Sequence, residues 1–293
     1  MIIVKLIGGL GNQMFQYATA RSLAEKHSTI LKLDLTGFEA YKLHRYSLHC
    51  FHIWEYIATH NEIKSIIGDS QNFTNRLKRK VTAKLGFSDG NQNLIREKYF
   101  HFDPTILELK DNVLIDGFWQ SEKYFADIPD ILRREFDVKY KQDPDSKEFS
   151  ELIQSNESIS IHVRRADYVQ NQVTNQVHGT CDRAYYDRCV NHIEARVSNP
   201  HFFIFSDEPE WARENLKLSH PTTIVDCNDP SRNYEDLRLM SQCQHNIIAN
   251  SSFSWWGAWL NSNPNKIVCA PEKWFNDPTR DTKDLIPNVW IKL

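Results

Sequence analysis

Short apolar runs alternate along the chain with stretches in which apolar residues return every three or four positions. The first run, residues 2–7, is rich in β-branched side chains, stops at a glycine-rich turn and precedes a stretch of helical spacing. Apolar runs favour buried strands, and the longer spacing favours helices. We predict further strands at residues 29–35, 112–118, 158–163, 201–205, 222–226, 246–249 and 266–269. Strands that alternate with helices predict an α/β fold.

The polar segment K-Y-K-Q-D-P-D-S-K-E-F-S at residues 139–150 interrupts this alternation. Its charges and its proline are typical of a domain boundary. We therefore predict two Rossmann-like domains, residues 1–140 and residues 151–293. We expect a cleft between them, with the last residues of the chain packing back on the first domain. Ligands of such sheets bind beyond the carboxyl ends of the strands.

The composition is that of a globular protein, with 41% hydrophobic and 25% charged residues. A net charge of -3 provides no basic field for a nucleic-acid partner. The six cysteines form no C-x-x-C pair, which favours free thiols in a reducing compartment. The apolar N-terminal run is too short to span a membrane and follows no basic region, so we expect a cytoplasmic protein. One basic cluster, whose alternatives are a solvated helix face and peripheral contact with the inner face of the cytoplasmic membrane, comprises Arg76, Lys78, Arg79, Lys80 and Lys84.

The glycine turn G-G-L-G-N-Q at residues 8–13 is the first candidate binding element. Glycines let the backbone approach a ligand, and the start of the following helix offers amide donors. We take Gly9, Asn12 and Gln13 as candidates. A purely structural turn is the alternative, and Met14 replaces the last glycine of the G-x-G-x-x-G fingerprint.

The string I-H-V-R-R-A-D-Y at residues 161–168 crowds polar groups onto the end of an apolar strand. Arg164 and Arg165 need an anionic partner if they are half-buried, and planar guanidinium donors suit a diphosphate. His162 is a further ligand candidate, and Asp167 is either a partner for an arginine or a proton acceptor. A structural ion-pair cluster is the alternative interpretation.

Two further strings follow predicted strands. In N-S-S-F-S-W-W at residues 250–256, hydroxyls and amides at a helix start can bind an anion, or can cap the helix and do no more. We interpret the tryptophans as packing. In F-S-D-E at residues 205–208, Asp207 can accept hydrogen bonds from guanine or ribose, or can cap the next helix. The candidate ligands of the first string are Ser251, Ser252, Phe253 and Ser254.

The sequence shows no evident metal site. The string Asp143-Pro144-Asp145 has the Asp-x-Asp pattern but lies in the predicted linker, and the two arginines can neutralise a diphosphate in place of a metal. An NAD-dependent oxidoreductase, suggested by the first β-α-β unit and Asp34, lacks the third glycine. A non-catalytic carbohydrate-binding protein is suggested by the eight tryptophans, but they cluster beside a serine-rich turn.

The chain resembles the bacterial α-1,2-fucosyltransferases of glycosyltransferase family 11 over most of its length. The strings that carry the resemblance are G-G-L-G-N-Q-M-F-Q-Y-A, R-Y-S-L-x-x-F-x-I, G-F-W-Q-S-E-K-Y-F, H-V-R-R-A-D-Y, F-S-D-E and N-S-S-F-S-W-W-G-A-W-L. Ala166 stands where the family often has glycine.

The resemblance implies a GT-B-like fold and metal-independent, inverting transfer of L-fucose from GDP-fucose to the 2-hydroxyl of a galactoside. The expected acceptor is a galactose-ended oligosaccharide of a surface glycan such as an O-antigen, assembled on a lipid carrier. We expect residues 1–140 to form the acceptor-side domain and residues 151–293 to form the GDP-fucose-binding domain. By likeness to more distant fucosyltransferases, Arg164 and Arg165 bind the diphosphate and Asn12 lies near the fucose. We expect Arg165 to stabilise the leaving GDP, and Asp167 is the candidate base.

Overall fold

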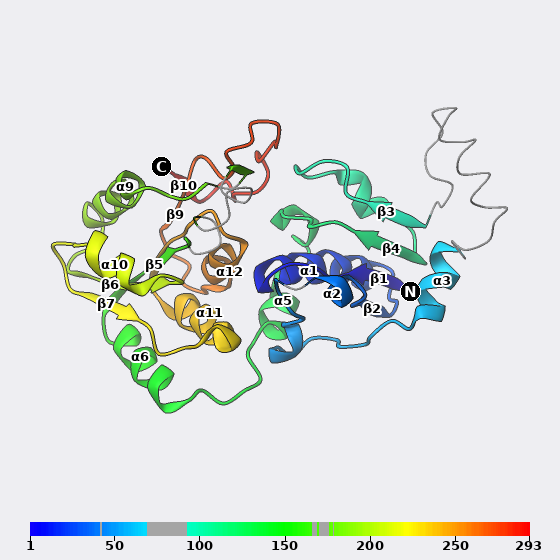
Figure 1. Ribbon diagram of the computed structural model, residues 1–293, viewed down its shortest axis with the longest axis horizontal. Coiled ribbons are helices and arrows are strands. Elements are labelled where there is room, and N and C mark those ends of the chain that lie inside the picture. The colour runs from blue at the N-terminus through cyan, green and yellow to red at the C-terminus, as the bar shows by residue number, and fades with distance from the viewer. Residues whose placement is uncertain (42, 69–92, 166–168, 170–175, 178) are drawn as a thin grey trace. The chain divides into compact units, whose positions relative to one another are not determined.

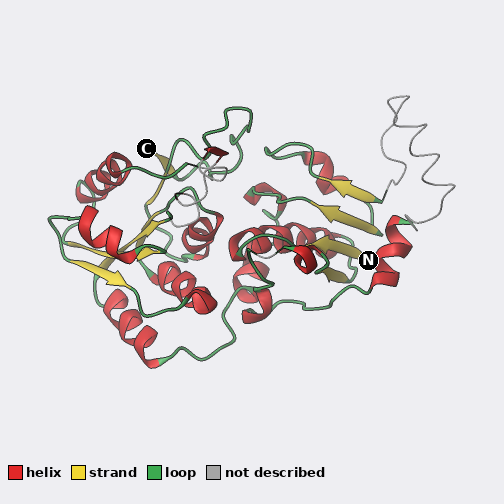
Figure 2. Ribbon diagram, in the orientation of Figure 1, coloured by secondary structure: helices red, strands yellow, loops and turns green. Residues whose placement is uncertain are grey.

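The computed structural model describes residues 1–41, 43–68, 93–165, 169, 176–177 and 179–293. Within them the chain forms two compact units, Met1–Asp137 and Val138–Leu293. Each unit is built on one sheet in which every strand pair is parallel. Figure 1 shows the elements of each unit, and Figure 2 marks the helices, strands and loops.

The sheet of the first unit has the strand order β2-β1-β4-β3. Its strands are β1 (Ile2–Lys5), β2 (Leu31–Asp34), β3 (Leu94–Arg96) and β4 (Val113–Asp116). Its α-helices are α1 (Leu10–Lys26), α2 (Gly37–Ala40), α3 (His60–Ile67) and α5 (Pro129–Glu135), and its 3-10 turns are η1 (Leu48–Cys50), η2 (Pro104–Glu108) and η3 (Glu122–Tyr124).

Local sequence explains how α3 meets this sheet. Thr59 and Glu62 form a reciprocal capping box that starts the helix. Ile63 and Ile66 lie three positions apart, so they share one face of the helix, and they pack on Ile3. The β-branched residues of β1 are completely buried, so this strand lies in the core of the unit.

The sheet of the second unit has the order β10-β9-β8-β5-β6-β7. Its strands are β5 (Glu157–Val163), β6 (Pro200–Ser206), β7 (Thr222–Val225), β8 (His245–Ile247), β9 (Val268–Ala270) and β10 (Ile291–Lys292). Its helices are α6 (Pro144–Gln154), α9 (Arg183–Glu194), α10 (Pro209–Asn215), α11 (Asn233–Gln242) and α12 (Ser252–Leu260), with the 3-10 turn η4 (Pro230–Arg232).

The core of the second unit lies between its sheet and its helices. Apolar residues of α9 and α10 pack with the central strands in one cluster. Helix α12 brings three tryptophans into the interior: Trp255 and Trp256 are fully buried, and the indole of Trp255 donates to the carbonyl of Leu285. The interpretation of these tryptophans as packing residues is confirmed.

Most predicted strands are present with shifts of a few residues at their ends. The three-residue strand β3 and the short terminal strand β10 were not predicted. Strand β10 pairs with β9, so the last residues of the chain belong to the second sheet. The expected linker, residues 139–150, overlaps the helix α6, which covers residues 144–154. The helix begins here because Asp143 accepts the amide of Ser146 as its N-cap and Pro144 occupies the first turn.

Candidate active site

In both sheets the strand order reverses at one central strand, and the candidate residues follow the strands at this reversal. In the second unit, β6 and β7 lie on one side of β5, whereas β8, β9 and β10 lie on the other. In the first unit, β2 and β4 flank β1 in the same way. A parallel sheet opens a crevice at the carboxyl ends of the strands where its order reverses, and ligands bind there.

Arg164 and Arg165 lie directly beyond β5 and pair with the two acidic residues that follow β6. Arg164 Nη1 is 3.0 Å from Asp207 Oδ2, and Arg165 Nε is 3.0 Å from Glu208 Oε2. The four side chains are only 18% to 27% exposed, so each guanidinium has the anionic partner that partial burial requires. The ion-pair cluster anticipated as an alternative is therefore present, and it lies at the carboxyl edge of the sheet.

Arg165 is held on two sides. Glu208 accepts its Nε–H, and its guanidinium carbon lies 4.0 Å above the centre of the Trp211 ring on α10. Its backbone amide donates to Asp207 Oδ1. A guanidinium has five N–H donors, and Nε–H is one of them. These contacts fix the plane of the guanidinium and use its Nε–H, and its two terminal amino groups carry the other four N–H donors.

His162 is the penultimate residue of β5 and is buried. Burial, and secondarily the charge of Arg164, lower the pKa of its imidazole to about 3, so the ring is neutral at neutral pH. Among the described residues, nothing hydrogen-bonds its Nδ1. Its ring centre lies 5.6 Å from that of Phe253, which joins β5 to the serine loop, residues 250–254, beyond β8.

Some residues of the serine loop bond to the loop's own backbone, and others are partly exposed to solvent. Ser251 caps α12 by accepting the amide of Phe253. Ser254 is buried, and its hydroxyl donates to the carbonyls of Ala249 and Ser251. Ser254 was expected to bind the ligand, but the structure assigns it to the loop's own backbone. Ser252 and Phe253 are half-buried at the start of α12.

In the first unit, β1 ends in the glycine turn and α1 begins at Leu10. Gly8 has φ +86°, and a Cβ there would lie 2.7 Å from Asn12 Nδ2, so this position needs glycine. Gly9 is the N-cap of α1 with an ordinary φ of −72°. Asn12 accepts a 2.8 Å hydrogen bond from Gln120, which follows β4. The two neighbouring strands thus bring an amide pair to the edge of the sheet.

Gln13 does not have the expected role. It is completely buried, its amide nitrogen donates to the carbonyls of Gly8 and Arg45, and its amide oxygen accepts the amide of Ser47. In this structure the side chain has no exposed surface, and its amide group is used in three bonds to the backbone. The structure therefore assigns Gln13 to joining the glycine turn to residues 45–47.

The turn after β4 is braced from the neighbouring strand. Glu97, directly after β3, accepts the amides of Phe118 and Trp119. Trp119 is buried at φ +56°, a conformation that costs energy for a bulky side chain. A Cβ on Gly117 would lie 2.4 Å from Glu97 Cβ. These constraints fix where Gln120 meets Asn12.

Sequence reasoning missed the residues that hold the candidates in place: Glu208, Trp211, Gln120 and Glu97. Glu208 and Gln120 stand beyond the carboxyl end of a predicted strand, which was an available signal, whereas Glu97 follows β3, which was not predicted. Trp211 gave none, because its contact with Arg165 depends on how α10 packs. Asp167 and the basic cluster at residues 76–84 lie outside the described residues, and Asp143 caps α6 and pairs with Arg232.

Comparison with known proteins agrees with this architecture. The chain aligns with a mutant of Arabidopsis thaliana FUT1 in complex with GDP with a TM-score of 0.51, at 14% identity, covering 93% of this chain and 71% of that one. The fold is therefore the GT-B-like α/β fold that the sequence predicted. Among the described helices, none is both long enough and apolar enough to cross a membrane.

The family model for glycosyl transferase family 11 matches residues 1–293, and the chain belongs to this family. It is 33% identical to an Escherichia coli alpha-1,2-colitosyltransferase over 100% of this chain and 99% of the relative. It is also 33% identical to the Escherichia coli O-antigen biosynthesis glycosyltransferase WbnK, covering 98% and 99%. A rat galactoside alpha-(1,2)-fucosyltransferase 2 is 24% identical, covering 89% and 67%. The chain is thus a glycosyltransferase.

Proposed function

We propose that this chain transfers L-fucose from GDP-fucose to the 2-hydroxyl of a galactose-ended oligosaccharide, with inversion at the anomeric carbon. The family supports glycosyl transfer, and the rat relative supports fucose and galactose as donor sugar and acceptor. WbnK supports a surface glycan as the product's destination. The proposed acceptor is carried on a lipid.

One observation carries the proposal: two guanidinium groups and a helix start meet at the β5/β8 reversal. Arg164 and Arg165 leave β5, the serine loop leaves β8, and His162 contacts Phe253 across the two. Guanidinium donors and the amides at the start of α12 are both suited to phosphate oxygens. This is the site that we propose for the GDP diphosphate.

The chemistry follows from the charge that appears as the sugar leaves. In a single displacement, the acceptor oxygen forms a bond to the anomeric carbon while the bond to the diphosphate breaks. Negative charge then grows on GDP, so donors fixed in advance stabilise the transition state more than the ground state. Arg165, gripped by Glu208 and Trp211, is such a donor. We propose that the diphosphate binds without a metal, because the arginines supply the positive charge.

The remaining proton leaves the acceptor hydroxyl. We keep Asp167 as the proposed base, and a flat pH profile with only a modest loss of rate in Asp167→Asn would remove it from that role. Asn12, oriented by Gln120, is proposed to lie near the fucose, and Asp207 to accept from the guanine or ribose once its pair with Arg164 loosens.

Colitosyl transfer is the second candidate, because a relative that is 33% identical over the whole chain uses that sugar. Colitose is fucose without its 3-hydroxyl. An enzyme that hydrogen-bonds this hydroxyl should discriminate strongly against the deoxy sugar, whereas a colitosyltransferase only has to tolerate its absence. The ratio of kcat/KM for the two donors therefore separates the candidates.

The test is incubation of the purified protein with GDP-fucose and lactose in EDTA, with the linkage of the product read by NMR. We expect an α-1,2-linked fucoside and a higher kcat/KM with GDP-fucose than with GDP-colitose. Arg165→Ala should lower kcat by about two to three orders of magnitude. A product with another linkage, a preference for GDP-colitose, or near-normal turnover in Arg165→Ala would each contradict a separate part of the proposal.

A further inference from the structure

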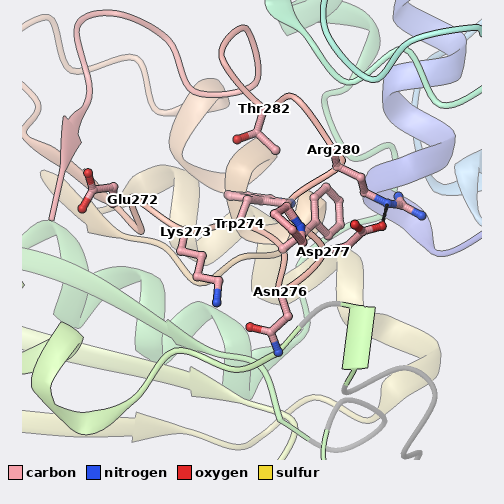
Figure 3. Close-up of a pocket in the computed structure, with 9 residues that line it drawn as sticks. Glu272, Lys273, Trp274, Asn276, Asp277, Arg280 and Thr282 are labelled. Carbon is pink, nitrogen blue, oxygen red and sulfur yellow. Dashed lines mark ion pairs between the residues drawn. The ribbon is translucent and has the colours of Figure 1, made fainter.

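A pocket of about 320 Å³ lies in the segment between β9 and β10. Figure 3 shows side chains around it, with Arg280 turned toward Asp277 and Thr282 on the opposite side from Asn276. All of its lining residues fall within residues 272–282, so none of the candidate GDP ligands contributes. The pocket is therefore separate from the site proposed for the donor, although both lie in the second unit.

The pocket lies at the same edge of the second sheet as the serine loop and is hydrogen-bonded to that loop. Strand β9 pairs with β8, so the segments that follow these strands leave the same edge of the sheet. Asn250, the first residue of the serine loop, is buried and donates to the carbonyl of Trp274 at 3.1 Å and to that of Gly179 at 3.3 Å. A single buried asparagine thus holds the serine loop and the wall of the pocket together.

The lining indicates a neutral, hydroxyl-rich ligand. Its charged residues, Glu272, Lys273, Asp277 and Arg280, balance to zero, so neither sign of charge dominates the lining. The Asp277–Arg280 pair is long, at 3.7 Å, and its members are 34% and 40% exposed, so both groups remain close to solvent. The guanidinium carbon of Arg280 lies 4.8 Å from the centre of the Phe275 ring, so the lining also offers an aromatic surface.

We propose that this pocket is an acceptor subsite that binds a sugar of the oligosaccharide other than the reacting galactose. Hydroxyls of a sugar can both donate and accept, which matches a lining of ammonium, guanidinium, amide and carboxylate groups. The inference rests on the proposed function, because it takes the acceptor to be an oligosaccharide. It extends acceptor recognition to the second unit, whereas the first unit alone was expected to be the acceptor side.

The test compares two acceptors in one pocket variant. Lys273→Gln and Arg280→Gln are combined, because both residues are exposed lining residues whose charge the fold does not bury. For a β-galactose-ended trisaccharide we expect KM to rise about tenfold, as loss of charged hydrogen bonds to a ligand implies. For methyl β-galactoside, which has no second sugar, KM should not change, and KM for GDP-fucose should not change with either acceptor. Lys283→Gln, an exposed lysine of the same segment outside the lining, is the matched control.

The outcomes separate this inference from the function on which it rests. Equal KM values in the variant and the parent, an equal rise for both acceptors, or a rise in KM for GDP-fucose would each overturn the subsite. If the parent protein transfers no fucose, the proposed function fails instead. Saturation-transfer NMR with the trisaccharide then decides the subsite alone: binding by the parent and the Lys283 variant, with loss in the double variant, supports it, and equal or absent binding overturns it.

Discussion

Arg165 shows how neighbouring side chains fix the orientation of a guanidinium group. Its Nε–H is taken by Glu208 and one face of its guanidinium rests on Trp211, both from the segment after β6. A cation above an aromatic face gains about 0.5–2 kcal/mol, depending on how far it is desolvated. The same contact reduces the freedom of a long side chain, so less entropy is lost when a ligand binds.

Trp211→Leu should therefore lower kcat/KM for the donor by about tenfold, whereas Trp211→Phe, which keeps an aromatic face, should retain most of it. The measurement is donor-saturation kinetics at fixed acceptor. Trp54→Leu is the control, because Trp54 lies 4.1 Å beneath the guanidinium of Arg21 in the first unit and is outside the candidate residues. Equal losses in the two tryptophan variants would mean that stability, and not the position of Arg165, explains the effect.

His162 links the site to the pH dependence of stability. Its pKa is lowered to about 3 by burial, whereas the unfolded chain protonates it near 6.5. Below pH ~6.5 the unfolded state binds a proton that the folded state does not, so stability present at neutral pH is lost as the pH falls. Between pH ~7 and ~5 this histidine should cost about 2 kcal/mol of unfolding free energy.

Urea unfolding of the parent and His162→Asn at these two pH values measures this contribution as a difference. Asp236 titrates with the opposite sign, because burial raises the pKa of its carboxyl to about 7, but it is present in both proteins and cancels. The variant should lose about 2 kcal/mol less than the parent on acidification. Parallel losses would show that the imidazole is protonated in the folded protein.

At the scale of the element, the turn between β1 and α1 depends on a side chain that the sequence marked for another purpose. Gln13 makes three bonds to backbone groups of residues 8 and 45–47. Gln13→Ala leaves these groups buried and unpaired and should lower the free energy of unfolding by about 3 kcal/mol. Gln154→Ala, an exposed glutamine on α6, should change it by less than about 0.5 kcal/mol in the same urea titration. A small loss in Gln13→Ala would return this residue to the list of candidate ligands.

The patterns that sequence reveals are local, and this decides which elements could be predicted. Apolar runs such as residues 158–163 and 201–205 identified strands of the second sheet, because a strand buried on both faces consists of consecutive apolar residues. Strand β3 has only three residues and a charged neighbour, so its sequence gives no strand pattern. It is a strand because it pairs with β4. Segment 144–154 is polar enough to resemble a linker, yet a cap, a proline and the burial of Ile153 make it a helix.

For the candidate site too, local sequence identified some residues but not the partners that hold them. Arg164 and Arg165 were found from their place at the end of an apolar strand, and the structure puts them at the edge where the strand order reverses. The partners of these residues come from Asp207 and Glu208, over forty positions later, and no local pattern joins the two segments. The backbone bonds of Gln13 to residues 45 and 47 could not be predicted either, because those residues are more than thirty positions away.

At the scale of the whole molecule, each unit presents its own cluster of candidate residues at the point where its strand order reverses. The proposed function assigns the diphosphate of the donor to the second unit and the sugar to the first, and this assignment can be tested for each unit separately. GDP carries the diphosphate, so it should slow amide hydrogen exchange in the second unit, at residues 164–165 and 251–253. GDP-fucose adds the sugar, so it should extend protection to residues 8–12 and 117–120 of the first unit, where Gln120 orients Asn12. A ligand at about 100 times its Kd stabilises its binding state by about 2.7 kcal/mol, which suffices for the measurement.

Arg165→Ala should abolish the protection that GDP gives, whereas Arg213→Ala should keep it, because Arg213 pairs with two exposed carboxylates outside the candidate residues, Glu210 on α10 and Asp226 directly after β7. Protection by GDP at the glycine turn but not at the serine loop would exchange the proposed roles of the two units. Identical maps for GDP and GDP-fucose would remove Asn12 from the neighbourhood of the sugar. The comparison works because one ligand contains the other, so the difference between the two maps reports the fucose alone.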